Sequence, residues 1–179
     1  MEVLKIITRA NGGDDYIDNA VDYIFDGRCD KIQGYGISSN DADSAKLQFK
    51  KIAEFEGNQD KNPFFHAIIS YTPETAPTTD VALSLTDKIL EPFTEDHAAL
   101  TGSHNKETEG SLYHTHTCIS TTNINGGKIM CPDNKTTYEM AQRVADITGQ
   151  PTTLVVENVK KVEWECPKTF YPQNEEDED

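Results

Sequence analysis

Two extended stretches that lie close together in the sequence limit the fold more than any other feature. Residues 98–104 and 112–122 have the composition of strands, and only the polar residues 105–111 separate them. Such a short connection joins antiparallel neighbours, because parallel strands need a crossover of a dozen or more residues. We therefore expect an antiparallel hairpin with a long tip.

The other expected elements complete an α+β pattern. Strands are expected at 2–8, 64–71 and 152–156, and residues 28–39 are Gly-rich and predicted to be irregular. Helices are expected where apolar residues recur every three or four positions behind a capping residue. They run from 14 or 15 to Gly27, from 40 or 41 to Gly57, from 79 to near Pro92, and from a capping box of Thr136 and Glu139 to Gly149. This order predicts one largely antiparallel central sheet covered by helices.

The length of 179 residues predicts a single domain, which we place at residues 1–172, followed by an acidic flexible tail at 173–179. The amino terminus has neither the apolar core nor the cleavage site of a signal peptide. No run approaches the ~18 apolar residues that a membrane span needs. We expect a cytoplasmic protein without a membrane segment.

The charge balance argues against broad, non-specific nucleic-acid binding. Asp and Glu number 31 against 16 Lys and Arg, and leaving out the five acids of the last five residues changes the formal net charge from −15 to −10. A surface that binds phosphates indiscriminately carries an excess of Lys and Arg. The four cysteines form no CxxC pair, so we expect reduced, structural thiols.

Two of the five histidines, His114 and His116, are separated by one residue in the expected strand 112–122. Side chains alternate along a strand, so both point to the same face. His104, at the end of the partner strand, can lie across from them and supply a third nitrogen to one divalent cation. The alternative is a pair of strand histidines without a ligand. His66 is expected to be a hydrogen-bonded residue near the core, and His97 a loop residue.

A candidate nucleophile is less clearly marked in the sequence than the histidine site. The chain has no Gly-x-Ser-x-Gly elbow, no phosphate-binding glycine loop and no HExxH motif. Tyr23 lies on the first expected helix, one position from its apolar face. By spacing alone it is an amphipathic tyrosine at a helix edge, and Tyr16, Tyr35 and Tyr113 have the same status.

Four stretches together resemble the relaxase domain of the MobA/VirD2-type mobilisation nucleases, HUH endonucleases of conjugative and mobilisable plasmids. They are EVLKIITRANGG at 2–13, AVDYIFDGR at 20–28, FFHAIISYTPE at 64–74 and SHNKETEGSLYHTHTCISTTNINGGK at 103–128. In this resemblance Tyr23 matches the nucleophile of the family, and His104, His114 and His116 match its three metal ligands.

The resemblance implies nicking of single-stranded DNA at an origin of transfer through a 5′-phosphotyrosine, with Mg or Mn as the metal. It also implies relaxosome accessory proteins and a coupling protein as partners, and a tuning role for Glu74. Lys106 stands where many members carry Asp, Ser120 replaces the commoner Asn, and members are usually basic. DNA binding would need a local stripe of cations drawn from Lys5, Arg9, Arg28, Lys31, Lys46, Lys50, Lys51, Lys128 and Lys135.

Three hypotheses follow from these observations. The first is a metal-dependent strand transferase that uses Tyr23. The second is a catalytically inactive relaxase-like module that binds DNA or protein, which the acidity favours. The third is a metal-assisted hydrolase that uses the three histidines without Tyr23.

Overall fold

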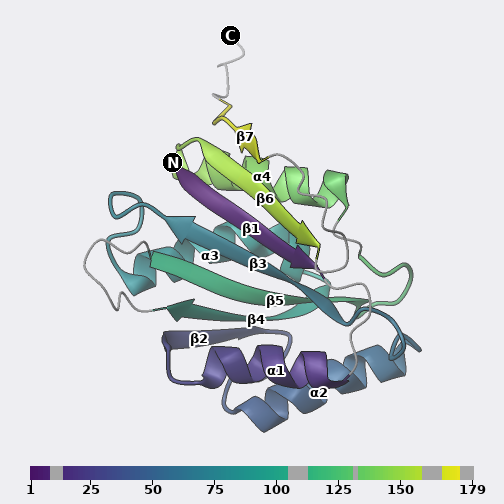
Figure 1. Ribbon diagram of the computed structural model, residues 1–179. Helices are drawn as coiled ribbons and strands as arrows, with labels where there is room; N and C mark the ends of the chain where they lie inside the picture. Colours follow the sequence, from purple (N-terminus) through teal and green to yellow (C-terminus); the bar gives the residue numbers. More distant parts are fainter. Residues whose placement is uncertain (9–13, 105–112, 131–132, 159–166, 174–179) are drawn as a thin grey trace.

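A computed structural model describes residues 1–8, 14–104, 113–130, 133–158 and 167–173 of the chain. Its strands and helices alternate through most of this part, and β4 and β5 follow each other as a hairpin (Figure 1). In chain order the elements are β1 (Glu2–Thr8), α1 (Asp14–Phe25), β2 (Cys29–Tyr35), α2 (Ala42–Phe55), β3 (Phe64–Tyr71), α3 (Thr79–Thr94), β4 (His97–His104), β5 (Tyr113–Asn123), α4 (Asn134–Thr148), β6 (Thr152–Asn158) and β7 (Lys168–Phe170).

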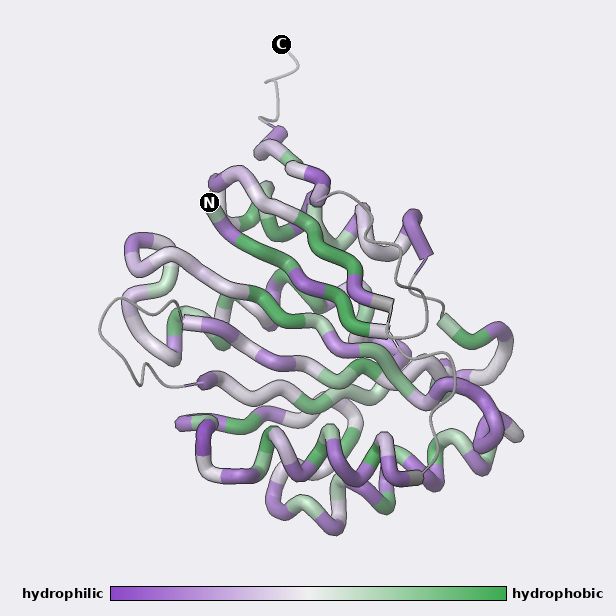
Figure 2. Tube along the Cα trace, viewed as in Figure 1, coloured by the Kyte–Doolittle hydropathy of each residue, from purple (hydrophilic) through white to green (hydrophobic). Residues whose placement is uncertain are grey.

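The strands form one sheet in the order β2-β4-β5-β3-β1-β6-β7. Every neighbouring pair is antiparallel except β1 and β6, which run parallel. The predicted α+β class with a largely antiparallel central sheet is therefore confirmed, and so is the hairpin. Hydrophobic residues gather on the central strands, whereas the helices carry many hydrophilic residues (Figure 2).

Strand alternation divides the core between the two faces of the sheet. Helices α3 and α4 pack on one face with Ile69, Ala99 and Ile119, and α1 and α2 pack on the other face with Leu100 and Cys118. Helix α1 contacts β2, β4 and β5, and α2 packs against α1 and β5. The carboxyl end of α1 therefore lies on the same face as alternate residues of the β4–β5 hairpin.

The sequence-based prediction missed two strands, β2 and β7. It treated residues 28–39, which include β2, as irregular. Strand β2 lies at one edge of the sheet, is mostly half-exposed, and pairs with β4 despite a bulge between Cys29 and Lys31. Strand β7 is a three-residue pairing with β6 at the other edge. Edge strands bury only part of one face, so their sequences lack the apolar alternation that marks β3 and β5.

Two local expectations are also wrong. Helix α4 begins behind Asp133, whose carboxylate accepts a hydrogen bond from the Thr136 backbone N–H at 2.9 Å, so Asp133 and not Thr136 is the N-cap. The expected end of α4 at Gly149 is confirmed by a positive φ of 68°.

His97 lies in β4 rather than in a loop, and its Nδ1 is 2.8 Å from the Ser120 carbonyl oxygen.

Several expectations concern residues outside the described part. The tail residues 174–179, Arg9, Lys106, Cys131 and Cys166 belong to this group, and the single-domain assignment of residues 1–172 stays a prediction. The two described cysteines, Cys29 and Cys118, are both free. No described helix combines the length and the apolar composition required to cross a membrane.

Candidate active site

The β4–β5 hairpin brings the three predicted histidines together. His104 lies directly opposite His114 in the register of the two strands, and His116 lies opposite Gly102. His114 and His116 share a face because one residue separates them. The position of all three imidazoles thus follows from strand pairing rather than from a loop.

Their rings form a compact cluster. Ring centroids lie 4.1 Å apart for His104 and His116, 4.6 Å for His104 and His114, and 5.1 Å for His114 and His116. One nitrogen from each ring lies within 4.8 Å of the other two. Nδ1 of His104 is 2.7 Å from Nε2 of His114, so one of these two atoms carries the shared proton.

The environment of these rings fits a metal ion. His104 and His116 are only 8% and 9% exposed, and Nε2 of His116 is buried without a hydrogen-bond partner among the described residues. Burial, followed by the charges of His104, His114 and His66, lowers the pKa of His116 to about 3. The imidazole of His116 is therefore neutral at physiological pH, which is the form that coordinates a cation. The three nitrogens can hold one metal ion.

On the opposite face of β5, a buried hydroxyl pair links this strand to α3. Thr115, between the two histidines, is fully buried and its hydroxyl is 2.8 Å from that of Thr86 on α3. The Thr86 hydroxyl is in turn 2.7 Å from the hydroxyl of Tyr71 on β3. Beside them, the hydroxyls of Thr101 and Thr117 are 2.8 Å apart across β4 and β5. Buried hydroxyl pairs of this kind hold strand and helix in register behind the histidines.

Tyr23 is the tyrosine that lies beside this cluster. It is half-buried near the carboxyl end of α1, and its ring centroid is 5.4 Å from that of His104 and 5.2 Å from that of His116. Helix α1 buries Val21 and Ile24 against the sheet, which leaves Tyr23 at the margin of the apolar face. Spacing alone could not distinguish Tyr23 from an ordinary tyrosine at a helix edge. In the structure its ring lies next to the imidazoles.

The other candidates lie elsewhere. Tyr16 is buried two turns earlier on α1 and stacks on His66, with centroids 5.6 Å apart. His66 is half-buried, and its Nε2 is 3.8 Å from the Cys118 sulfur. Tyr35 belongs to β2, and Tyr113 packs against the core on the α3 side. Glu74 follows β3 and is exposed.

Among the residues that join α1 to β2, the sequence-based prediction gave a role only to Arg28, as one of several cations that a DNA-binding stripe would need. Arg28 lies over the Tyr23 ring, with its Cζ 5.2 Å from the centroid. Cys29 lies opposite His104, and burial, followed by Asp26 and Asp30, raises the pKa of its thiol to about 11. A thiol in this state is a poor nucleophile and a poor metal ligand. The signal in the sequence was the Asp-Gly-Arg turn directly after α1.

Most of the described cations that a DNA-binding stripe would need form local ion pairs. On α2, Lys46 and Lys50 bind Asp22 and Asp18 of α1 at 2.6 and 2.8 Å. Further pairs join Lys5 to Glu157, Arg28 to Asp26, Lys31 to Asp80 and Lys51 to Glu54. Six of the twelve described Lys and Arg residues are thus paired with acids.

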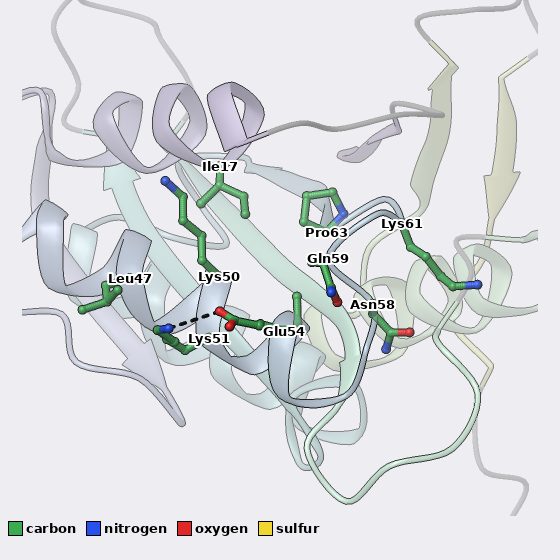
Figure 3. A pocket seen from close by; sticks show the side chains of 10 residues that line it. Ile17, Leu47, Lys50, Lys51, Glu54, Asn58, Gln59, Lys61 and Pro63 are labelled. Carbon is green, nitrogen blue, oxygen red and sulfur yellow. Dashed lines mark hydrogen bonds and ion pairs between the residues drawn. The ribbon is translucent and has the colours of Figure 1, made fainter.

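A separate cavity of about 470 Å³ lies between α1, α2 and the loop before β3 (Figure 3). Ile17, Lys50, Glu54, Lys61 and Pro63 are among the residues that line it, and none of the three clustered histidines is among them. Ile17 is six residues before Tyr23 on α1, or ~9 Å along the helix axis. The cavity is therefore not the histidine site.

Comparison with known proteins defines the class to which this fold and site belong. A family model described as "Relaxase: MobA/VirD2-like, nuclease domain" matches residues 16–150, which include Tyr23 and all three histidines. The protein is therefore a nuclease domain of the relaxase type. Specifically, the chain belongs to the MobA/VirD2-like relaxase family.

A solved structure supports the fold. It is described as "Molecular Basis of Vancomycin Resistance Transfer in Staphylococcus aureus" and resembles this chain with a TM-score of 0.56 at 13% sequence identity. The similarity covers 83% of this chain and 90% of the other. At this identity the likeness concerns the fold alone. No curated protein sequence matches the chain.

Proposed function

We propose that this chain nicks and rejoins single-stranded DNA at an origin of transfer through a 5′-phosphotyrosine formed on Tyr23. His104, His114 and His116 are the proposed ligands of a Mg²⁺ or Mn²⁺ ion. Relaxosome accessory proteins and a coupling protein are the partners that the same proposal implies. The observation that carries it is the distance of 5.2 to 5.4 Å between the Tyr23 ring and the rings of His116 and His104.

The chemistry needs a nucleophile and a means of stabilising charge on the phosphate. The Tyr23 Oη attacks phosphorus, the new O–P bond forms, and the bond from phosphorus to the 3′ oxygen breaks. A phosphotyrosine conserves the energy of the phosphodiester, so the free 3′-hydroxyl can attack it and restore the strand. A bound cation would supply Lewis-acid stabilisation to the phosphate oxygens.

The residues around the nucleophile suit this task. The helix holds Tyr23 on a rigid element, and paired strands hold the imidazoles, so little reorganisation is needed when the substrate binds. The low pKa of His116, about 3, keeps its nitrogen lone pair available across the physiological range. The acidity of the chain favours recognition of one DNA site over broad binding to phosphates.

A covalent-capture experiment tests the proposal. The chain is incubated with a randomised pool of single-stranded oligonucleotides and Mn²⁺ or Mg²⁺, and protein–DNA adducts are isolated under denaturing conditions. We expect an adduct with wild type and with Tyr16→Phe, but none with Tyr23→Phe or in the presence of a chelator. Sequencing the captured strands then gives the nick site.

Each other outcome has a meaning. An adduct that survives in Tyr23→Phe moves the nucleophile to another tyrosine. DNA and metal binding without any adduct would favour the inactive module. Strand cleavage that is unaffected by Tyr23→Phe would favour the hydrolase that uses the histidines alone.

A further inference from the structure

The strongest unassigned feature is the position of Arg28 next to both parts of the proposed site. Its Cζ is 5.2 Å from the centroid of the Tyr23 ring. It directly precedes Cys29, whose Cα is paired with that of His104 across β2 and β4. The guanidinium therefore lies at the same end of the sheet as the histidine cluster and on the ring that borders it.

The turn between α1 and β2 places Arg28 there. Gly27 ends the helix region with a φ of +95°, a value that other residues rarely adopt. A Cβ at Gly27 would meet no atom within 4 Å, so backbone angle and not space requires the glycine. The left-handed conformation of Gly27 reverses the direction of the chain. The side chain of Arg28, five positions after Tyr23, therefore lies over the Tyr23 ring.

Asp26 orients the guanidinium from the same turn. Its Oδ1 accepts a hydrogen bond from the Arg28 backbone N–H at 3.0 Å, and its Oδ2 lies 3.0 Å from Arg28 Nε. The pair engages only Nε of the guanidinium. Within the described residues, both terminal Nη atoms have no acceptor, and the Arg28 side chain is 56% exposed. Four N–H groups in a planar fork are thus left for a ligand.

We propose that Arg28 is a phosphate-binding catalytic residue of this site, and that Asp26 is the residue that positions it. The inference rests on the proposed function, since the ligand is the phosphodiester that Tyr23 attacks. The Nη groups donate to its non-bridging oxygens, the acceptors that a guanidinium fork matches best. These hydrogen bonds strengthen as negative charge accumulates on the oxygens in the transition state.

The step balances without a further reactant. The Tyr23 Oη–P bond forms as the bond from phosphorus to the 3′ oxygen breaks. The phenol loses its proton, and the departing 3′ oxygen gains one, so no net proton is released or consumed. Arg28 stays protonated throughout, and it provides hydrogen bonds and positive charge but no proton.

A purely structural role for Arg28 predicts different behaviour. The ion pair with Asp26 is solvent-accessible, and such pairs contribute little to stability. If Arg28 only closed the turn, its removal would change the thermal midpoint and leave the kinetics of folded protein intact. If it binds phosphate, its removal changes rate and DNA binding while the protein stays folded.

The kinetic test uses an oligonucleotide that wild type converts to the covalent adduct. We expect Arg28→Ala to lower the rate constant of adduct formation at saturating DNA by about a hundredfold or more. Arg28→Lys should recover part of this loss, because it keeps the charge without the fork. Asp26→Asn should cost less than Arg28→Ala, and the double variant should match Arg28→Ala if Asp26 acts only through Arg28.

Lys168→Ala is the matched control. Lys168 also places a cation over an aromatic ring, with its Nζ 4.1 Å from the centroid of Tyr138. It lies on β7, at the edge of the sheet opposite β2. The substitution removes the same charge and the same type of contact, and we expect wild-type rates.

A binding test does not depend on turnover. In a Tyr23→Phe background, affinity for a single-stranded oligonucleotide is measured against salt concentration. Loss of one phosphate contact in Arg28→Ala should reduce the slope of log affinity against log salt by about 0.7.

Wild-type adduct rates and an unchanged slope in folded Arg28→Ala would overturn the inference and leave Tyr23 chemistry standing. Absence of both adduct and DNA binding in wild type would overturn the inference and the proposed function together.

Discussion

His104 and His114 face each other directly across β4 and β5, and their facing nitrogens, Nδ1 and Nε2, are 2.7 Å apart. Backbone pairing on both strands sets this approach. Two neutral imidazoles at such a distance share one proton, and they present two lone pairs to one point once that proton moves to the other nitrogen of its own ring. Metal binding at this pair therefore requires each ring to carry its proton on the nitrogen that faces away from the ion.

Removal of one imidazole should weaken metal binding strongly. His114→Ala leaves two ligands, and we expect the affinity for Mn²⁺, measured by titration calorimetry without DNA, to fall by about tenfold or more. His97→Ala is the matched control, because His97 lies at the other end of β4 and its Nδ1 contacts the Ser120 carbonyl. Equal affinities in the two variants would exclude the three-histidine site.

The stability of the metal-free protein should depend on the protonation of His116. The pKa of this imidazole is about 3 in the folded chain, chiefly through burial, against an ordinary value near 6.5. Between these values the unfolded chain binds a proton that the folded chain does not. The contribution of His116 is therefore fully present above pH ~6.5 and is lost progressively as the pH falls.

The measurement compares wild type with His116→Gln by urea unfolding in the presence of a chelator, at several pH values between about 5 and 7. The free energy of unfolding of wild type should fall more steeply on acidification, by up to about 1.4 kcal/mol per pH unit. His97, whose pKa is also lowered by burial, is present in both proteins and cancels in the comparison. Parallel curves would show that His116 is not buried as a neutral group.

The elements with strong periodicity are predictable from the sequence. Strand β3 has the bounds that its apolar run predicts, and the predicted hairpin already places His104 across from His114, because antiparallel neighbours must face each other. The histidine cluster is predictable for the same reason. Strand alternation and one pairing are enough to gather three imidazoles.

The features that sequence patterns miss depend on contacts between distant segments. Strand β2 is recognisable only through its pairing with β4, since residues 29–35 lack apolar alternation. The choice of Tyr23 over Tyr16 depends on how α1 docks on the sheet, because both lie near its apolar face. The position of Arg28 depends on the direction of the chain after Gly27, which one backbone angle decides.

The buried hydroxyl of Thr86 should matter for stability. It bridges Tyr71 and Thr115 at 2.7 and 2.8 Å, so Thr86→Val leaves two buried hydroxyls with a lost partner. We expect the free energy of unfolding to fall by about 1–3 kcal/mol. Thr86→Ser keeps the hydroxyl and should retain much of the wild-type stability. A valine variant as stable as the serine variant would show that the bridge contributes nothing.

The absence of a side chain at Gly102 sets the distance between α1 and the histidine strands. A Cβ at this position would lie 2.5 Å from the Cys29 sulfur and 2.9 Å from Cγ2 of Ile24. Gly102→Ala therefore displaces the side chains of Cys29 and Ile24, and a shift of α1 that makes room for Ile24 also moves Tyr23, the residue before it. We expect a loss of about 1–3 kcal/mol in unfolding free energy and a slower adduct-forming reaction in the folded fraction.

Ser103→Ala is the control on the opposite face, where the buried hydroxyl has no hydrogen-bond partner among the described residues. Wild-type stability and rate in Gly102→Ala would mean that the helix does not depend on this contact for its position.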